Sequence, residues 1–226
     1  MTSSHVLRAN AILFAALILS ACHGARQATA SPLPRPVGGD AASAAKAKAD
    51  SARYPYTAAD VHFMSGMIAH HAQAIAMSRW APTHGASSSV RTLAERIINA
   101  QQDEIAIMQQ WLRDRGQPVP EPNAAGMTMT MGGMEHVMLM PGMLSDDQMK
   151  QLDAARGADF DRLVLRFMIQ HHRGAVSMVK DLFATYGAGQ DLLVFKLASD
   201  VNVDQTTEIA RMERMLAATL LERRTP

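Results

Sequence analysis

The sequence contains one eleven-residue segment twice, with few changes between the two copies. The first copy, MIAHHAQAIAM, spans Met67–Met77, and the second, MIQHHRGAVSM, spans Met168–Met178. The similarity continues farther along, where QQDEIAIMQQWL, beginning at Gln101, corresponds to QTTEIARMERML, beginning at Gln205. Self-similarity of this length indicates two equivalent structural units. Any fold of this chain must therefore bring together two copies of one supersecondary structure.

The first unit is predicted to be a helical hairpin. Its first helix starts at Thr57, which together with Asp60 fits a capping box, and ends at about Ala81, before a proline. Its second helix follows the serines at 87–89 and ends at Gly116, a favourable residue for a helix C-terminus.

The second unit adds a short helix in front of its hairpin. Ser145 and Gln148 form another capping-box pattern, which predicts a helix start. The helix with the second histidine pair is expected over residues 158–187, and the last helix over 190–223. No β-branched run with a period of two stands out, so no strand is expected. Two hairpins of long amphipathic helices predict an all-α protein, a four-helix bundle.

The N-terminal residues have the pattern of a bacterial lipoprotein signal. Arg8 precedes the apolar run ANAILFAALILSAC, which is too short to span a bilayer but suits a signal-peptide core. The run ends in LSAC, which resembles a lipobox, so Cys22 is expected to carry lipid; an ordinary secretory signal is the alternative. The next residue, His23, is not the aspartate associated with inner-membrane retention. We therefore expect a lipid-anchored protein of the periplasm or cell envelope, with the outer membrane favoured.

These signals predict how the chain is divided. The parts are a signal peptide at 1–21, a disordered tether rich in Ala, Pro, Gly and Lys at 22–52, and a bundle domain at 53–226. Within the domain, repeat one covers 57–116, a methionine-rich linker covers 117–144, and repeat two covers 145–223.

Cysteine content, charge and motifs narrow the possible functions. Cys22 is the only cysteine, so its lipidation would leave no thiol for a disulfide or a metal site. The formal net charge is +1 and no basic block stands out, which argues against a nucleic-acid partner. The chain has no Gly-x-Ser-x-Gly nucleophile elbow and no phosphate-binding loop. We therefore expect that the protein is not an enzyme.

Helical geometry places both histidines of a copy beside one inward stripe. Successive helix residues differ by about 100° in direction. Relative to Met67, His70 therefore lies about 60° to one side and His71 about 40° to the other. Both are neighbours of Met67 at i,i+3 and i,i+4 spacing, so the three could share one ligand. The second copy repeats this arrangement with Met168, His171 and His172.

Other residues of the repeats could support such sites. Met77 and Met178 lie about 10 Å farther along their helices, where they suit a second ion or a relay. Four polar residues on the apolar stripes of the partner helices need hydrogen-bond partners, and the histidines are the obvious candidates: Gln101, Glu104, Gln205 and Glu208. A glutamate that accepts the second imidazole N–H would fix the tautomer of a ligating histidine. The alternative is a packing role, with histidines bonded to glutamates and methionines filling the core.

The linker between the repeats is unusually rich in methionine. Its segment GMTMTMGGMEHVMLMPGM, at 126–143, carries further candidate ligands: Met127, Met129, Met131, Met134, His136, Met138, Met140 and Met143. Thioethers are soft ligands that select Cu(I) and need no deprotonation. The alternative is a flexible apolar lid or partner surface.

These motifs resemble a known family. The segment MPGMLSDDQMKQLDAARGADFDRLVLRFMIQHHRGAVSM, together with the paired M-x-x-H-H-x-x-A patterns, resembles the domain-of-unknown-function 305 family, which includes CopM-like copper-binding proteins. The resemblance covers roughly Tyr56 to Leu221. It implies a ferritin-like four-helix bundle in the cell envelope, and binding of Cu(I), or of Cu(II) or Ag(I), through methionine and histidine. The matching positions are Met67, His70, His71, Met77, Met168, His171, His172 and Met178.

The residues and the resemblance together favour a protein that sequesters Cu(I) or transfers it to a copper-transfer partner. A di-iron bundle needs Glu-x-x-His motifs, and the sequence has none. A haem bundle with Met and His axial ligands is a further alternative, but there is no Cys-x-x-Cys-His for covalent attachment. The third alternative is a helical interaction module of the cell envelope that binds no metal.

Overall fold

The computed structural model describes residues 41–222 of the 226-residue chain. In these residues the elements are α1 Ala41–Arg53, α2 Ala58–Arg79, α3 Ser88–Asp114, β1 Met127–Met131, β2 Met134–Met138, α4 Asp146–Ala154, α5 Gly157–Ala184 and α6 Leu192–Glu222. The predicted signal peptide, Cys22 and the first part of the tether lie outside them. Among the described helices, none is both long enough and apolar enough to cross a membrane.

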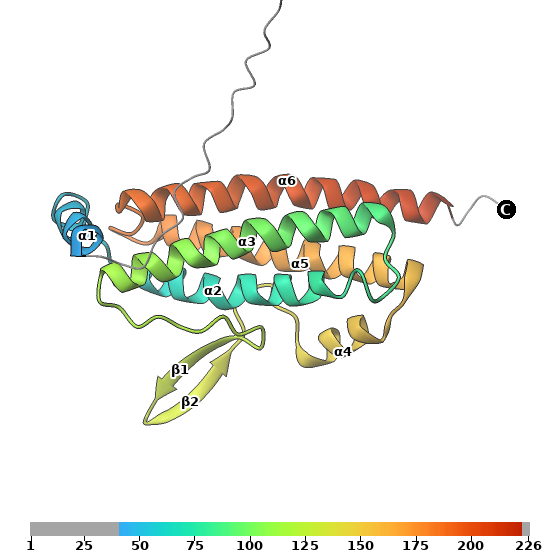
Figure 1. Cartoon of the computed structure of the whole chain (residues 1–226), viewed down its shortest axis with the longest axis horizontal. Coiled ribbons are helices and arrows are strands. Elements are labelled where there is room, and N and C mark those ends of the chain that lie inside the picture. The colour runs from blue at the N-terminus through green and yellow to red at the C-terminus, as the bar shows by residue number, and fades with distance from the viewer. Residues whose placement is uncertain (1–40, 223–226) are drawn as a thin grey trace, which may run out of the picture. The chain divides into compact units, whose positions relative to one another are not determined.

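The four long helices form the predicted bundle of two hairpins. Helix α2 packs along α3, α5 packs along α6, and the two hairpins meet mainly through α2 and α5 (Figure 1). Methionines and aliphatic residues fill the interior between them. The expected all-α fold, a four-helix bundle from duplicated hairpins, is therefore confirmed.

The predicted helix starts are confirmed at atomic detail. At the start of α2, the Thr57 amide donates to Asp60 Oδ2 at 2.6 Å, and the Asp60 amide donates to Thr57 Oγ1 at 3.3 Å. Asp60 Oδ1 also accepts from the Gly189 amide at 2.7 Å, which ties the start of α2 to the turn between α5 and α6. Ser145 and Gln148 form the second capping box at the start of α4.

Part of the predicted tether is helical. We expected no fixed structure before residue 53, but Ala41–Arg53 forms α1. The physical reason is its composition, because alanine and lysine have high intrinsic helix propensity. A low-complexity stretch of this kind can be helical where Pro and Gly are absent.

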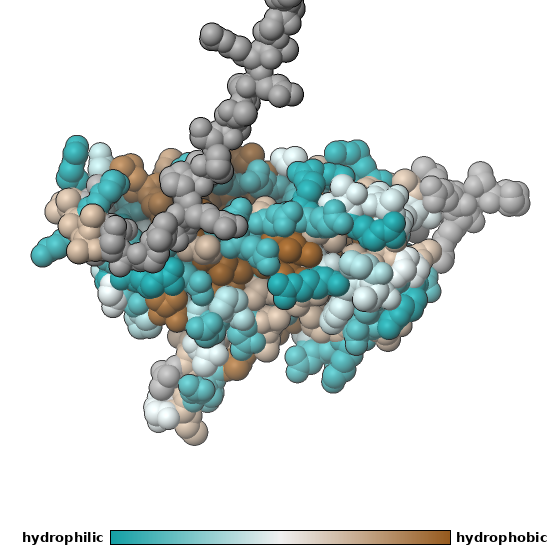
Figure 2. All heavy atoms as spheres, viewed as in Figure 1, coloured by the Kyte–Doolittle hydropathy of each residue, from teal (hydrophilic) through white to brown (hydrophobic). Residues whose placement is uncertain are grey.

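The expectation of no strands was wrong in the linker. Met127–Met131 and Met134–Met138 pair as an antiparallel hairpin, which projects from the bundle (Figures 1 and 2). Its two-residue turn is Gly132–Gly133, with φ of 61° and 81°. Positive φ at both turn positions matches the type I′ turn, whose twist suits a hairpin and for which Gly-Gly is a preferred pair.

After the hairpin, the linker enters the bundle. Met140, Met143 and Leu144 are buried. Gln73 on α2 holds this segment in place, because its Oε1 accepts from the Leu144 amide at 2.6 Å and its Nε2 donates to the Leu144 carbonyl at 3.1 Å. The linker is thus part of the core and not a loop that merely joins the repeats.

Glycine in α5 makes room for this segment. A Cβ on Gly174 would lie 1.9 Å from the Pro141 carbonyl oxygen and 2.6 Å from Gly142 Cα, both backbone atoms. A Cβ on Gly66 in α2 would instead meet the flexible end of Met140, with its Sδ at 2.8 Å. Backbone contact at Gly174 cannot be relieved by a change of rotamer.

We predict different effects for the same substitution at these two helical glycines. Gly174→Ala should lower the free energy of unfolding by about 2 kcal/mol, because overpacking against backbone outweighs the roughly 1 kcal/mol gain in helix propensity. Gly66→Ala should lie within about 1 kcal/mol of the wild type, since a methionine end can move. Urea unfolding followed by circular dichroism measures both. Equal effects would show that the linker segment is not held against α5 as described.

Candidate metal centre

The four repeated histidines meet at the contact between α2 and α5. His70, His71, His171 and His172 all have 0% exposed surface. The ring centroids of His70 and His171, from different repeats, are 3.8 Å apart. Those of the sequence neighbours are 6.3 Å apart in the first copy and 6.2 Å in the second. The two repeats therefore share one histidine layer, a question that the sequence left open.

The outer histidine of each pair is bonded to a glutamate. His71 Nε2 lies 2.7 Å from Glu104 Oε2 of α3, and His172 Nε2 lies 2.8 Å from Glu208 Oε2 of α6. A carboxylate accepts the N–H, so in the neutral imidazole Nδ1 keeps its lone pair. The predicted histidine–glutamate hydrogen bonds are confirmed.

The inner histidines are less completely bonded. His70 Nε2 donates to the Pro141 carbonyl at 3.0 Å, so the linker supplies its partner. Neither nitrogen of His171 has a hydrogen-bond partner, and Nδ1 is unpartnered in His70, His71 and His172 as well. Buried polar atoms are nearly always hydrogen-bonded, and one left unpaired costs about 1–3 kcal/mol. Five such nitrogens in one layer favour a ligand-binding role over simple packing.

Burial keeps the inner histidines uncharged. Loss of solvation, together with the neighbouring His71, lowers the pKa of His70 to about 3. Burial and the adjacent His70 lower the pKa of His171 well below its ordinary value. A metal ion binds the neutral imidazole, so no proton must be displaced from these two rings at neutral pH.

Methionines lie on both sides of the histidine layer. Met67 and Met178 belong to one buried cluster, which also contains the linker residues Met140 and Met143. The other buried cluster contains Met77, Met168 and Met212. The sequence had grouped Met67 with one histidine pair and Met168 with the other. In the structure, each buried cluster instead contains methionines of both repeats, because α2 and α5 pack antiparallel.

A small acidic pocket lies outside the histidine layer, between α3 and α6. It has a volume of about 150 Å³, and its lining includes Glu104, Asp204 and Glu208. Its buried amides, Gln101 and Gln205, leave their Oε1 atoms unpartnered, so the expectation that they bond to histidines was wrong. Burial and the nearby Glu104 raise the pKa of Asp204. Arg96 also lines the pocket, but the three carboxylates outnumber it, and the excess negative charge would attract a cation toward the two glutamates that hold His71 and His172.

The donor set decides which ions fit. Within residues 41–222, no group of three or more His, Cys, Asp or Glu side chains is arranged to hold a metal ion. Besides the imidazole nitrogens, the soft donors of the bundle interior are the methionine sulfurs of the two buried clusters. Such a mixed soft donor set suits Cu(I) or Ag(I) and not an ion that needs carboxylates.

Sequence reasoning missed two groups near the centre. The Pro141 carbonyl partners His70, and its role depends on the path of the linker, which no motif marks. His62 lines a surface pocket of about 160 Å³ together with Met140, Met178 and Asp181. Its position on α2, two turns before His70, was the available signal.

The linker methionines divide into two groups. Met140 and Met143 join the buried cluster that contains Met67, and the Met140 amide donates to Met143 Sδ at 3.3 Å. The residues of the hairpin itself, from Met127 to Met138, lie outside the histidine layer; Met127 packs against the buried cluster, while Met134 and Met138 are exposed.

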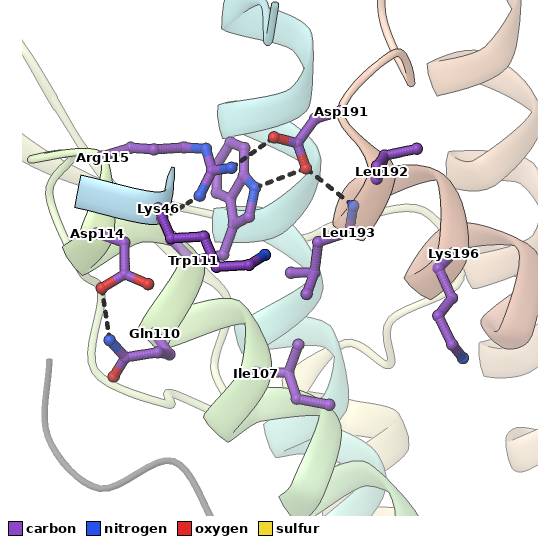
Figure 3. Close-up of a pocket in the computed structure, with 10 residues that line it drawn as sticks. All are labelled: Lys46, Ile107, Gln110, Trp111, Asp114, Arg115, Asp191, Leu192, Leu193 and Lys196. Carbon is purple, nitrogen blue, oxygen red and sulfur yellow. Dashed lines mark hydrogen bonds and ion pairs between the residues drawn. The ribbon is translucent and has the colours of Figure 1, made fainter. Parts of the chain in front are cut away.

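A larger pocket, of about 400 Å³, lies where α3 ends and α6 begins (Figure 3). Asp191 accepts from the Trp111 indole at 3.1 Å and from the Leu193 amide at 3.0 Å, and it pairs with the Arg115 guanidinium. Asp191 is thus fully engaged, although the Arg115 Nε has no partner, and no histidine or methionine lines the pocket. The interactions of Asp191 stabilise this end of the bundle, but the pocket offers no soft ligand.

We predict that the inner histidines make the fold sensitive to acid. Their pKa values are lower in the folded chain than the ordinary 6.5, so between about pH 6.5 and pH 3 the unfolded chain binds more protons. The free energy of unfolding should therefore decrease as the pH is lowered through this window, by up to about 1.4 kcal/mol per pH unit for each histidine. Urea unfolding at a series of pH values measures the slope.

The double variant His70→Gln/His171→Gln is the comparison for this prediction. Glutamine does not titrate, so the slope of stability against pH should be shallower in the variant than in the wild type. An unchanged slope would show that other groups cause the acid sensitivity.

Comparison with known proteins places the chain in a family. Among curated proteins, none matches it. A DUF305 protein from Streptomyces coelicolor, described as a predicted secreted protein, is 32% identical with a TM-score of 0.59, over 71% of this chain and 93% of that one. A DUF305 fragment from Deinococcus radiodurans is 29% identical with a TM-score of 0.59, over 73% and 99%.

Structures of CopM are similar as well. CopM in its Cu(I)-bound form is 27% identical with a TM-score of 0.53, over 70% of this chain and 96% of CopM. Other CopM structures contain Cu(II) or Ag. The profile of the domain of unknown function DUF305 matches residues 60–216. Because this match covers more than half of the sequence, the chain belongs to the DUF305 family.

Proposed function

We propose that this protein binds Cu(I) at the histidine layer and sequesters it or passes it to a partner protein. The observation that carries the proposal is the set of unpartnered imidazole nitrogens in His70, His71, His171 and His172. A bound ion would accept their lone pairs and relieve the penalty of leaving them unpaired. The similarity to CopM, which is known with Cu(I), Cu(II) and Ag, supports copper or silver as the ion.

The chemistry of the layer favours Cu(I) over harder ions. One oxygen of each of the carboxylates Glu104 and Glu208 accepts a histidine N–H, so these glutamates orient the imidazoles. Thioethers of Met67, Met168, Met77 and Met178 lie in the buried clusters on either side. A soft ion is the one that such sulfur and imidazole donors bind in preference.

The proposed role is binding and not turnover. The histidines are fully buried, so an ion bound there would be shielded from solvent and from redox partners. We further propose that the protein acts in the cell envelope, held to a membrane by lipid on Cys22. The lipobox pattern supports this location, as does the description of the Streptomyces coelicolor relative as a predicted secreted protein.

We predict that removal of the four imidazoles abolishes tight Cu(I) binding by the bundle. The purified protein and the variant with His70, His71, His171 and His172 changed to Ala are titrated anaerobically with Cu(I) against a competing chelator. The variant should bind at least about 100-fold more weakly, a change that corresponds to about 2.7 kcal/mol. Equal affinity in both proteins would refute the histidine layer as the site.

His84→Ala is the matched control for this titration. His84 is also a buried histidine, but its Nε2 is bonded to Asp153 and its Nδ1 lies 3.0 Å from the Thr83 hydroxyl. Its loss should destabilise the fold without changing Cu(I) affinity. Comparable loss of binding in this control would mean that disruption of the fold explains the result.

We predict that the glutamates act by orienting the histidines. Glu104→Ala should weaken Cu(I) binding by about 10- to 100-fold, because His71 loses the acceptor that fixes its tautomer. Glu104→Gln should retain most of the affinity, since the amide oxygen can still accept the N–H. The same chelator competition measures both variants. Equal losses would indicate that the charge of Glu104, and not its hydrogen bond, supports binding.

A further inference from the structure

The hairpin gathers soft ligands on one of its two faces. In its register, Met127 is paired with Met138, and Met129 with His136. Alternate residues of a strand point to the same face, so these four residues share one face. We call them the methionine ladder. The opposite face carries the pair Thr128 and Val137.

The spacing of the ladder suits metal coordination. Directly opposed residues of antiparallel strands have Cβ atoms about 5 Å apart. Flexible methionine side chains on such a pair can bring two donor atoms to one ion. The neighbouring pair lies about 7 Å farther along the strands, close enough for an ion to move between pairs. Near the turn, Met134 extends the series of thioethers and is paired in the register with Met131.

Packing does not explain the exposed methionines of the hairpin. Met134 is 65% exposed and Met138 is 42% exposed, so neither fills the core. Methionine is not among the residues that favour strands, and a lone two-stranded hairpin is only marginally stable in water. Alternating threonine and methionine in MTMTM places the thioethers of this strand on one face and its threonines on the other.

The inner end of the ladder touches the bundle. Met127 packs against the buried cluster that contains Met67, Met140 and Met143. That cluster borders the histidine layer through Pro141, whose carbonyl accepts from His70. Thioethers thus lie at intervals from the exposed part of the hairpin to the interior of the bundle.

We propose that the methionine ladder is a second, outer site for a soft monovalent cation, Cu(I) or Ag(I), which captures the ion at the surface and passes it to the histidine layer. The transfer of the ion to the histidine layer rests on the function proposed above, whereas capture of the ion by the hairpin does not. The ion exchanges one thioether or imidazole ligand for the next, and no oxidation or proton transfer is required.

Titration with Ag(I) tests this proposal, because Ag(I) is soft and does not change its oxidation state in air. The whole protein is labelled with methyl-¹³C methionine, and silver nitrate is added in chloride-free buffer. The ladder variant is Met129→Leu/His136→Gln/Met138→Leu, which removes donors but keeps the side-chain bulk. The control variant Thr128→Val/Val137→Thr exchanges the residues of the opposite face.

Because the proposed transfer runs toward the histidine layer, we expect the histidine ring signals to respond first, and further Ag(I) to shift the methyl signals of Met127, Met129 and Met138 in the wild type and in the control. The ladder variant should retain a helical circular dichroism spectrum, bind at least one Ag(I) fewer, and load the histidine layer about tenfold more slowly, as judged from histidine ring signals.

Three results would overturn the proposal. If the histidine signals saturate and the hairpin methyl groups do not shift even when Ag(I) is in excess, there is no outer site, although the bundle site stands. If the control variant loses as much binding as the ladder variant, the methionine face is not the site. If the hairpin binds Ag(I) but the variant loads the bundle at the wild-type rate, the passing role is wrong. A protein whose hairpin shifts while its histidines do not respond would contradict the bundle site instead.

Discussion

Four imidazole rings are buried where α2 meets α5, and much of the surrounding structure serves to orient them. Burial lowers the pKa of His70 and His171, so these two inner rings are uncharged at neutral pH. The outer helices α3 and α6 each supply one glutamate to the outer rings, and the linker supplies a carbonyl to His70. Each of the two hairpins and the linker thus contributes a partner, and the nitrogens that remain without one are concentrated in a single layer.

The linker has two roles that differ in solvent exposure. Its second part lies inside the bundle, where Gln73 holds Leu144 and the backbone at Pro141 and Gly142 passes against Gly174. Its first part forms a hairpin outside the bundle, with thioethers on one face. Because a single short segment includes both, thioethers extend from solvent to the centre without any change of fold.

The arrangement fits the similarity of this chain to CopM, whose structures contain copper or silver. Thioether and neutral imidazole are donors that stay unprotonated near neutral pH, so affinity for a soft ion does not depend on deprotonation there. The acidic pocket between α3 and α6 adds negative charge beside the glutamates. Soft donors inside and carboxylates at the periphery together favour a cation over an anion or an organic ligand.

The sequence alone determined the helices α2 to α6, the capping boxes of α2 and α4, the duplication and the histidine–glutamate pairs, because these depend on local spacing and on the equivalence of the repeats. It also signalled the hairpin, through MTMTM and Gly132–Gly133, although the absence of β-branched runs led us to expect no strand. Only the tertiary structure decided that the repeats share one histidine layer, that the Oε1 atoms of Gln101 and Gln205 stay unpaired, and that methionines of opposite repeats fall into the same buried cluster. Those outcomes depend on how antiparallel helices are aligned and on the path of the linker, which are set by packing between distant residues and leave no periodic pattern in the chain.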